Sequence, residues 1–521
     1  MPPTHITILG GGITGLSSAL HLSRRYPSSL ITLLEKSPRF GGWIRSERVQ
    51  VSSPNTSKKI GQHNENETNS ASVVLEYGPR TLRPNSKAVL ELINLLSLST
   101  SLITIPRSHP SAQNRFLQVS GTQGLTKLPS SLLSFLTSPL LWPVLRELAF
   151  RPPNRRIQGV EDDESVHSFL SRRFGETFAR RYGSALVHGI YAADSRILSV
   201  RAAFPTLWDA ESRGFGSVGR GVLFGAFGVG KSSGEERYEL GSIEEKMKGV
   251  SVYSFRDGME TLVQALVRDL EGMKNVRLVK DVEVTSVRPI EEDKSFEITT
   301  CSQPMHRTTH IFSTLPLSTL HHLLPPSSPL PLAHLQANPS SNVRVINLVF
   351  PPTDKKILPD GFGYLIPRPE AGYPAAGEGH EGELGMLGVV FDSCSLGAQD
   401  YSLPQSSSSS SHSTSPSQFT KLTIMQGGPY PLSPSPTPLA SLLRTLSSHL
   451  PSLPDPVLVK SHTHMACIPT PTPGHTKRME ELKGALRVWQ GGRFEVGGAG
   501  VGGVSLGDCV LAGKVAGAAW D

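Results

Sequence analysis

The stretch His5-Ile6-Thr7-Ile8-Leu9-Gly10-Gly11-Gly12-Ile13-Thr14-Gly15 decides the fold of this chain. Apolar residues at 5–9 predict a β-strand, and glycines follow it at G-x-G-x-x-G spacing before an apolar helix. A second apolar strand at 30–34 ends at Glu35. This order of strand, turn, helix, strand and acid predicts a βαβ unit that binds an adenine dinucleotide.

Each glycine of the turn has a separate task in such a unit. Gly10 permits the tight turn, Gly12 lets the backbone approach a pyrophosphate, and Gly15 allows the helix to pack closely on the strand. The helix N-terminus faces the phosphates. Glu35 can accept hydrogen bonds from ribose hydroxyls and would repel a 2′-phosphate, which argues against NADP. The alternative, a βαβ unit without a ligand, is disfavoured by the complete motif.

A second glycine pair, Gly41-Gly42, follows the acidic strand directly, with Arg39 before it and Trp43 and Arg45 after it. This arrangement resembles the flavin-dependent amine oxidase superfamily, in which the segment lines the pyrophosphate and ribityl chain of FAD. The resemblance therefore implies that FAD, rather than NAD, is the cofactor.

Length and composition limit the classes of protein. A chain of 521 residues is long enough for about three domains with a large core. The net charge of +7 suits an anionic partner, but no nucleic-acid-binding module accompanies it. The four cysteines include no C-x-x-C pair, so neither a disulfide framework nor a metal site is expected. No apolar run reaches the length of a membrane span and no signal-peptide pattern occurs, which predicts a soluble or peripheral protein.

Three segments interrupt the regular pattern. Residues 50–71 and the Ser-rich tract 403–418 are expected to be disordered surface insertions. Residues 217–250 are expected to form a linker, with a mobile loop near a site as the alternative. The Gly-Lys-Ser at 230–232 lacks a preceding apolar strand and therefore does not predict a P-loop.

Further motifs occur in order along the chain. They are Glu76-Tyr77-Gly78-Pro79-Arg80-Thr81, a predicted strand at 112–117 that contains Arg115, and the segments 165–169, 188–195, 361–367 and 466–475. Together they resemble the eukaryotic, oxygen-dependent protoporphyrinogen oxidase family. The resemblance runs nearly end to end and is lost only over the insertions and Pro-rich linkers.

The C-terminal segment fits the same family. Residues 494–496 predict a strand, 497–506 are a glycine-rich turn, and 508–519 predict a helix. In this superfamily the corresponding junction closes over the flavin, with the helix N-terminus near the ring. The family usually has an Asn where this chain has Gly507, so a side-chain contact expected there must be missing or replaced. A flexible glycine-rich tail is the alternative.

The resemblance implies which residues contact FAD. Val504 to Leu506 would lie beside the ring. Val282 would contribute from an alternating strand at 278–284, although ordinary sheet core explains that valine equally well. The implied cofactor-binding residues are Gly10, Gly11, Gly12, Ile13, Thr14, Gly15, Glu35, Lys36, Arg39, Gly42, Trp43, Gly78, Pro79, Arg80, Thr81, Val282, Ala499, Val504, Ser505 and Leu506.

The substrate that the family implies, protoporphyrinogen IX, is a large apolar tetrapyrrole with two propionates. Its pocket should be apolar with a cation at one edge. The resemblance assigns the propionate contact to Arg115, because a guanidinium can hold a carboxylate through two parallel hydrogen bonds. From sequence alone a surface salt bridge would explain this arginine better. Phe362, Leu365 and Met425 match apolar residues that sandwich the ring system, although such residues are more often plain core.

No residue is assigned to catalysis and no metal site is expected. His167, His188 and His475 could be proposed as bases, but each is more often structural. By resemblance, the flavin N5 accepts a hydride from a meso carbon bridge, and dioxygen reoxidises the flavin to give hydrogen peroxide. Three such cycles would remove six electrons and make the macrocycle aromatic.

Between residues 125 and 216 the pattern becomes helical. An apolar stretch at 132–145 precedes the basic residues Arg151, Arg155 and Arg156, which could hold the stretch against an anionic membrane surface. An internal helical core explains the same pattern. The family implies peripheral attachment to the inner mitochondrial membrane. It leaves two protein partners open, a second copy forming a homodimer and the enzyme of the ferrochelatase step.

The expected fold class is α/β. It combines a Rossmann-like FAD-binding domain built from discontinuous segments, a mixed-sheet substrate domain and a helical membrane-associated domain. The expected boundaries place FAD-binding segments at 1–105, 251–292 and 460–521, the helical domain at 106–216 and the substrate domain at 293–459. Two rival functions remain, an amine oxidase or carotenoid-desaturase-like enzyme, and a non-catalytic flavin-binding or membrane scaffold protein.

Overall fold

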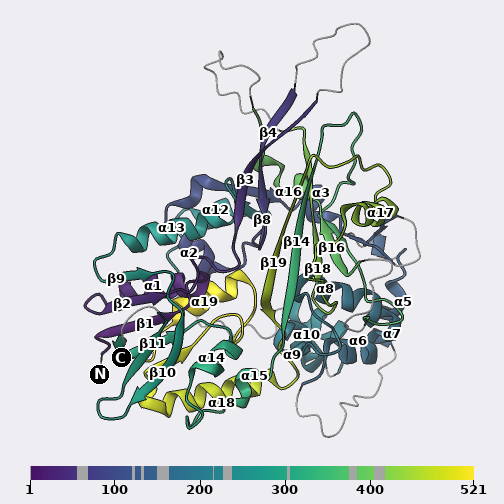
Figure 1. Ribbon diagram of the computed structural model, residues 1–521. Helices are drawn as coiled ribbons and strands as arrows, with labels where there is room; N and C mark the ends of the chain where they lie inside the picture. Colours follow the sequence, from purple (N-terminus) through teal and green to yellow (C-terminus); the bar gives the residue numbers. More distant parts are fainter. Residues whose placement is uncertain are drawn as a thin grey trace.

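A computed structural model describes residues 2–54, 68–119, 124–130, 134–135, 137–149, 163–214, 216–226, 238–301, 306–374, 384–403 and 417–520. Two lobes lie side by side (Figure 1). One lobe is built on a parallel sheet and holds both chain ends, and the other is built on a long mixed sheet with helices packed around it. Among the described residues, none of the helices combines the length and the apolar character needed to cross a bilayer.

The parallel sheet has the strand order β20-β13-β1-β2-β9. Its strands are β20 (Phe494–Val496), β13 (His310–Ser313), β1 (His5–Leu9), β2 (Leu30–Leu34) and β9 (Val276–Val279). Each neighbouring pair runs parallel. The βαβ unit predicted from the glycine turn is confirmed, since α1 (Ile13–Arg25) connects β1 to β2.

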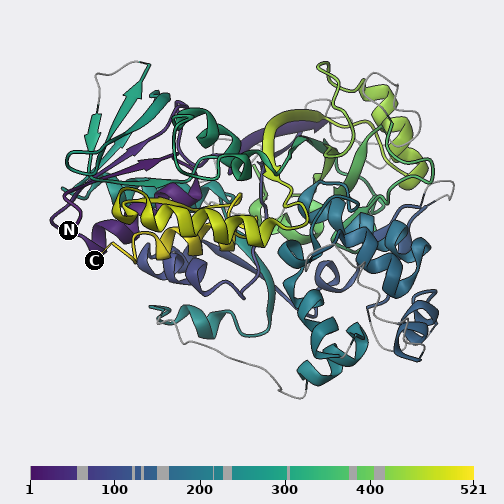
Figure 2. The same ribbon diagram turned by 90° about the horizontal axis from the view of Figure 1, so that it is seen from below.

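Helices from distant parts of the chain cover one face of this sheet. They are α1, α2 (Lys87–Leu95), α13 (Glu260–Glu271) and α19 (Leu506–Val515), whose buried residues form one core with β1 and β2. α19 packs on α1, and Figure 2 shows the yellow C-terminal segment in the same lobe as the purple N-terminal segment. A second core on the other face is built from β10 (Val284–Ile290), β11 (Ser295–Thr300), α14 (Leu317–Leu323) and α18 (His475–Val488). Both faces of the sheet are therefore buried, which is typical of parallel sheets.

The mixed sheet of the second lobe has the strand order β19-β14-β18-β16-β15-β6-β7. Its strands are β19 (Leu458–Pro469), β14 (Ser340–Phe350), β18 (Thr420–Gly427), β16 (Met386–Val390), β15 (Gly363–Leu365), β6 (Phe116–Leu117) and β7 (Thr126–Lys127). α17 (Leu439–His449) packs on one face through Leu442 and Leu446. Near the sheet lies a helical group with a core of its own, which includes α6 (Val166–Phe174), α8 (Ser184–Tyr191), α9 (Val200–Ala203) and α10 (Pro205–Arg213).

A hairpin joins the two lobes. Its strands β3 (Ser46–Pro54) and β4 (Thr68–Glu76) leave the first lobe and run beside the mixed sheet, where β17 (Tyr401–Ser402) pairs with β4 (Figure 1). A two-stranded ribbon of β5 (Leu102–Pro106) and β8 (Val250–Phe255) lies beside the hairpin's base. Remaining short elements are β12 (His306–Thr308), α3 (Pro110–Gln113), α5 (Leu141–Ala149), α7 (Glu176–Phe178), α11 (Val218–Ala226), α12 (Ile243–Lys246), α15 (Ala333–Gln336) and α16 (Asp392–Leu396).

Several local predictions are wrong for identifiable reasons. The strand predicted at 112–117 begins only at Phe116, because His109 caps the short helix α3 and Pro110 occupies its first position. The strand predicted at 278–284 is broken at Asp281, whose φ is +58°, so Val282 lies in the connection from β9 to β10. The C-terminal helix starts at Leu506, because Ser505, rather than a later residue, caps it, and it ends at Val515, where Ala516 leaves the helical conformation.

The predicted insertions and domain boundaries also change. Residues 50–54 and 68–71 belong to the hairpin β3–β4, while 55–67 and 404–416 lie outside the described residues. The predicted linker at 217–250 contains α11, which packs on α10, so the helical group extends beyond residue 216. Long-range strand pairing moves other boundaries. β13 belongs to the parallel sheet and not to the substrate domain, and β19 and β6 belong to the mixed sheet.

Candidate functional site

Two glycine turns dock on each other at the carboxyl end of β1. Gly12 forms an isolated parallel bridge with Gly41, and Gly41 N donates to Gly11 O at 2.8 Å. A Cβ at Gly15 would lie 2.0 Å from Gly10 O, so only glycine lets α1 pack this closely on the turn. The two motifs that are separate in sequence therefore form one backbone cradle.

The cradle presents backbone donors to open space. Gly12, which has no side chain to cap the helix, is the N-cap of α1, and no acidic residue stands in the first helical turn. A Cβ at Gly12 would meet no protein atom within 4 Å among the described residues. Because the first N–H groups of a helix lack intrahelical acceptors, Ile13 and Thr14 can donate to an anion here. The geometry fits a pyrophosphate.

Glu35 is fixed by its own loop. Its carboxylate accepts from Gly11 N at 2.7 Å, from Ser37 N at 2.9 Å and from Ser37 Oγ at 2.6 Å. The neighbouring Lys36 is exposed, and Val282 N donates to Glu35 O at 3.0 Å. Carboxylate oxygens keep further acceptor capacity, so the ribose contact expected of Glu35 stays a prediction.

Arg39 holds the second glycine turn rather than projecting from it. Its Nη1 donates to Phe40 O at 3.1 Å and to Ile44 O at 3.0 Å, its Nη2 donates to Gly42 O, and Glu260 lies 3.8 Å away. Trp43 is 38% exposed. The guanidinium therefore shapes the cradle, and its predicted contact with a cofactor is untested.

The segment Gly78–Thr81 packs directly on this turn. A Cβ at Gly78 would lie 2.2 Å from Trp43 O. Arg80 turns away into the second lobe, where its Nη1 pairs with Asp392 Oδ1 at 3.1 Å and both side chains are almost completely buried. Sequence reasoning placed Arg80 at the cofactor and did not identify Asp392 as its partner.

The C-terminal junction completes the cradle. Ser505 and Asp508 form a capping box at the start of α19, and Val504 packs against the helical group. A Cβ at Gly498 would lie 3.4 Å from Thr14 Oγ1, which places the segment leading to Ala499 beside the first turn of α1. A Cβ at Gly507 would lie 2.7 Å from Ser86 Oγ. A larger side chain at Gly507 would therefore require Ser86, the N-cap of α2, to move.

Two of the predicted substrate residues, Leu365 and Met425, lie on one face of the mixed sheet. Leu365 pairs with Gly388, Gly388 with Met425, and Met425 with Val345. Directly paired residues point to the same face of a sheet, so these side chains form an apolar row opposite the face that α17 covers. Phe362 N donates to Asn114 O at 3.0 Å, which brings Phe362 beside the segment of Arg115.

Arg115 lies at the edge of that row. Its Nη1 donates to Ala112 O at 3.1 Å, and among the described residues it has no carboxylate partner. Burial and then the nearby Arg83 guanidinium hold the pKa of Arg115 below its ordinary value. Among the residues that the structure describes, Arg115 has Arg83 as a neighbouring cation and no acid beside it, which suits an anionic group better than the surface salt bridge that sequence alone favoured.

One face of α8 was missed by sequence reasoning. Leu186, Gly189 and Ile190 are exposed on it, and a Cβ at Gly189 would lie 2.8 Å from Leu365 Cδ2. The i, i+4 spacing of Leu186 and Ile190 indicates an apolar helix face. Sequence alone does not distinguish such a face from a buried one, because the sheet that α8 faces is unknown at that stage. An apolar face on α8 therefore adjoins the apolar row at Leu365.

The three histidines considered earlier have structural contacts. His188 Nδ1 lies 2.7 Å from Ile366 O and its Nε2 lies 2.8 Å from Tyr373 Oη, so Nδ1 carries the proton and Nε2 accepts from the tyrosine. Burial lowers the pKa of His188 to about 4, and that of His475 to about 4 as well. His167 lies near Glu176. Within the described residues, no group of three or more His, Cys, Asp or Glu side chains could hold a metal ion.

Glu76 is a buried acid at the base of the Gly78 segment. Its carboxylate accepts from Met259 N at 2.8 Å and from Ser46 Oγ at 2.7 Å. Burial raises the pKa of Glu76 to about 7 despite these hydrogen bonds. The folded chain therefore binds this proton more tightly than the unfolded chain, whose glutamate titrates near 4.5.

This pKa gives a pH dependence with a definite sign. The stability that the proton contributes is complete below the unfolded pKa and is lost as the pH rises toward the folded pKa. Between pH 5 and pH 8, Glu76 should lower the free energy of unfolding by roughly 2 to 3 kcal/mol. Glu76→Gln should remove this fall, which urea unfolding at both pH values measures. Parallel pH profiles for the two proteins would contradict the raised pKa.

Comparisons with known proteins agree with this geometry. The family model "Flavin containing amine oxidoreductase" matches residues 13–407. Protoporphyrinogen oxidase of Macaca fascicularis is 31% identical over 98% of this chain and 97% of its own length. That of Schizosaccharomyces pombe is 29% identical over 98% of this chain and 96% of its own length.

A solved structure shares the fold. It is described as a candidate protoporphyrinogen oxidase from Exiguobacterium sp. 255-15, and it superposes with a TM-score of 0.68 at 20% identity over 98% of this chain and 97% of that one. At this identity the likeness concerns the fold alone. The cradle, the matched family model and the full-length relatives agree. The chain is thus a FAD-dependent oxidoreductase and belongs to the flavin containing amine oxidoreductase family, within it to the protoporphyrinogen oxidases.

Proposed function

We propose that this chain oxidises protoporphyrinogen IX to protoporphyrin IX in haem biosynthesis. The observation that carries the proposal is the alignment with protoporphyrinogen oxidases over 98% of the chain. The apolar row with Arg115 at its edge supports it, because an apolar ring system with acidic side chains requires such a pocket.

The residues of the chain bind and orient FAD and the substrate, and the cofactor supplies the redox chemistry. The glycine turns would hold the FAD pyrophosphate, Glu35 the ribose, and the Gly78 and Val504 segments would border the ring. When bound, FAD is the oxidant of the tetrapyrrole, and dioxygen is the final acceptor. Leu365 and Met425 exclude water from the apolar face, and Arg115 fixes the edge of the substrate.

An aerobic assay tests this function directly. Flavin-loaded protein given protoporphyrinogen IX should develop porphyrin fluorescence and release about three molecules of hydrogen peroxide for each porphyrin formed. Benzylamine should leave the flavin oxidised under anaerobic conditions, which separates this activity from that of an amine oxidase. A flat fluorescence trace from flavin-loaded protein would overturn the proposal.

Arg115→Ala should raise the Michaelis constant for protoporphyrinogen IX by about 10- to 100-fold, because a charged hydrogen-bond partner of the propionate is lost. The turnover number should change little. Arg115→Lys should give an intermediate value, since an ammonium keeps the charge without the bidentate geometry. Arg24→Ala, at an exposed ion pair with Glu239, is the matched control. An unchanged Michaelis constant in Arg115→Ala would remove the proposed role.

Attachment to the inner mitochondrial membrane is also proposed. On α5, Trp142 is 76% exposed and Leu145 is 42% exposed, which suits shallow insertion at a lipid interface. The basic residues at 151, 155 and 156 lie outside the described residues. Trp142→Ser with Leu145→Ser should weaken flotation with anionic vesicles about tenfold, because two apolar side chains no longer insert. Equal flotation of both proteins would argue for an internal role of α5.

Two protein partners remain proposals. A second copy of the chain would form a homodimer, and the enzyme of the ferrochelatase step would receive the product. Sedimentation of the purified protein, alone and mixed with that enzyme, tests both associations.

A further inference from the structure

The strand β4 lacks a neighbouring strand along part of one edge. Among the described residues, β17 pairs with β4 only at Ala71 and Ser72. The backbone groups of Val74 and Glu76 on that edge therefore need other partners, because buried N–H and C=O groups without hydrogen bonds are costly.

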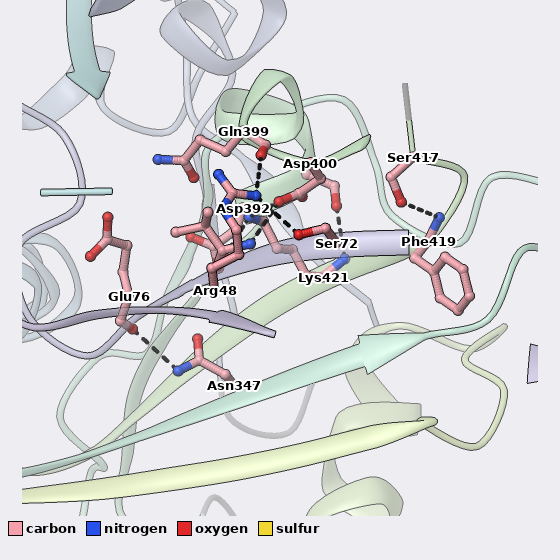
Figure 3. A network of polar contacts seen from close by, with 12 residues as sticks. Arg48, Ser72, Glu76, Asn347, Asp392, Gln399, Asp400, Ser417, Phe419 and Lys421 are labelled. Atoms are coloured by element: carbon pink, nitrogen blue, oxygen red, sulfur yellow. Dashed lines mark hydrogen bonds and ion pairs between the residues drawn. The ribbon is translucent and has the colours of Figure 1, made fainter. Parts of the chain in front are cut away.

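Side chains from the second lobe take the place of the missing strand. Asp400 Oδ1 accepts from Val74 N at 2.9 Å, and Lys421 Nζ donates to Val74 O at 2.7 Å. Asn347 Nδ2 donates to Glu76 O at 3.2 Å. Figure 3 shows Asn347 pointing toward Glu76, with Asp400 and Lys421 further along the hairpin. The contacts follow β4 in order, as a strand would.

The substituting side chains are buried and polar. Asn347 is 3% exposed, Lys421 3% and Asp400 5%, and Lys421 Nζ pairs with Asp400 Oδ1 at 2.9 Å. Burial raises the pKa of Asp400 even beside this lysine. An apolar pair of similar volume often stabilises a protein as well as a buried ion pair does. These residues are therefore expected to matter more for the position of β4 than for the free energy of unfolding.

The edge that they fix leads to the cradle. Two residues beyond Glu76, Gly78 packs on Trp43 O, and the neighbouring Gly41 bridges to Gly12. On the other side, Asn347 lies two residues from Val345 in β14 and therefore on the same face as the apolar row. Thr423 Oγ1, 2.6 Å from Asn347 Oδ1, orients the amide.

We propose that Asn347, Asp400 and Lys421 are positioning residues that replace a strand along β4 and set the distance between the FAD cradle and the substrate face of the mixed sheet. None of them needs to touch FAD or substrate to do this. The part of the inference that concerns turnover rests on the proposed function, and the part that concerns FAD binding does not.

Asn347→Leu tests the inference, because leucine keeps the branched shape of the side chain and removes the donor to Glu76 O. At temperatures well below unfolding, FAD should bind about fivefold more weakly, and turnover at saturating FAD should fall about fivefold with the Michaelis constant nearly unchanged. Lys421→Met should have the same signature. FAD binding is followed by the quenching of flavin fluorescence and by the visible circular dichroism of the bound flavin.

Leu446→Ala is the matched control. It opens a cavity under α17, on the opposite face of the mixed sheet, and so lowers stability without touching the contacts that Asn347, Asp400 and Lys421 make with β4. Its FAD affinity and turnover should match the wild type within about twofold in the folded protein. If Asn347→Leu and Lys421→Met behave like Leu446→Ala, the residues are merely structural and the inference is wrong.

Should Asn347→Leu fail to fold, the isosteric Thr423→Val carries the same comparison, since it removes the hydroxyl that orients the Asn347 amide and also contacts Asp392 Oδ2. A wild-type protein that binds FAD but does not oxidise protoporphyrinogen would overturn the proposed function. The difference in FAD affinity between Leu446→Ala and the two variants Asn347→Leu and Lys421→Met would still decide the inference.

Discussion

Gly12→Ala should yield a folded protein that no longer retains FAD. The backbone at Gly12 has φ −71° and ψ −179°, which alanine adopts without strain. No described protein atom lies within 4 Å of the added methyl group, so the fold should be unaffected. The methyl group would instead occupy the approach to the uncapped helix N-terminus, and FAD affinity should fall about 100-fold, or roughly 2.7 kcal/mol.

Two glycines provide the comparison. Gly484→Ala, in α18, meets no described atom within 4 Å and should bind FAD like the wild type. Gly15→Ala should destabilise the fold itself, because its Cβ would lie 2.0 Å from Gly10 O. Flavin content after purification, a titration with FAD and a urea unfolding curve distinguish the three variants. A yellow, flavin-saturated Gly12→Ala protein would contradict the assigned pyrophosphate site.

Asp392→Ala should cost roughly 3 to 5 kcal/mol of folding free energy, because it leaves the Arg80 guanidinium buried and unpaired. The two side chains are 5% and 6% exposed and lie 3.1 Å apart. Among the described residues, none accepts a hydrogen bond from Arg80 Nη2. The loss should appear as a lower urea midpoint with an unchanged slope.

A double variant distinguishes the loss of the ion pair from the cost of one unpaired buried charge. Arg80→Met with Asp392→Leu should recover most of the lost stability, since apolar residues of similar volume tolerate the site better than one unpaired charge. Glu239→Ala breaks the exposed pair with Arg24 and should cost less than about 1 kcal/mol. If Asp392→Ala is no more destabilising than Glu239→Ala, solvent reaches Arg80 and the Arg80–Asp392 ion pair is not buried.

The sequence signals that succeeded are local ones. β1, the glycine turn, α1 and β2 follow one another within a few turns of chain, so spacing alone identifies them. The signals that failed depend on partners far away in sequence. Only pairing with β1 shows that β13 belongs to the cofactor-binding sheet. Asn347 and Asp392 look like ordinary polar residues until Glu76 and Arg80, far away in sequence, are placed against them.

The candidate site follows the same division. The spacing of the glycines predicted the cradle, and the family resemblance selected Leu365, Met425 and Arg115, which the sheet register brings near one another. Arg39 and Arg80 were assigned to the cofactor by the same family resemblance. Their observed partners are backbone carbonyls and Asp392, which no spacing rule reveals.

The parallel sheet draws its strands from both ends of the chain. β1 is finished within the first ten residues, whereas the edge strand β20 and the helix α19 that packs on α1 lie at 494–496 and 506–515. A ribosome must therefore complete nearly the whole polypeptide before the nucleotide-binding half can close. Until then the apolar surface of the nascent amino-terminal segment stays uncovered. Chaperones must therefore protect this surface during synthesis and during any transport across an organelle membrane, which a contiguous Rossmann domain would not require.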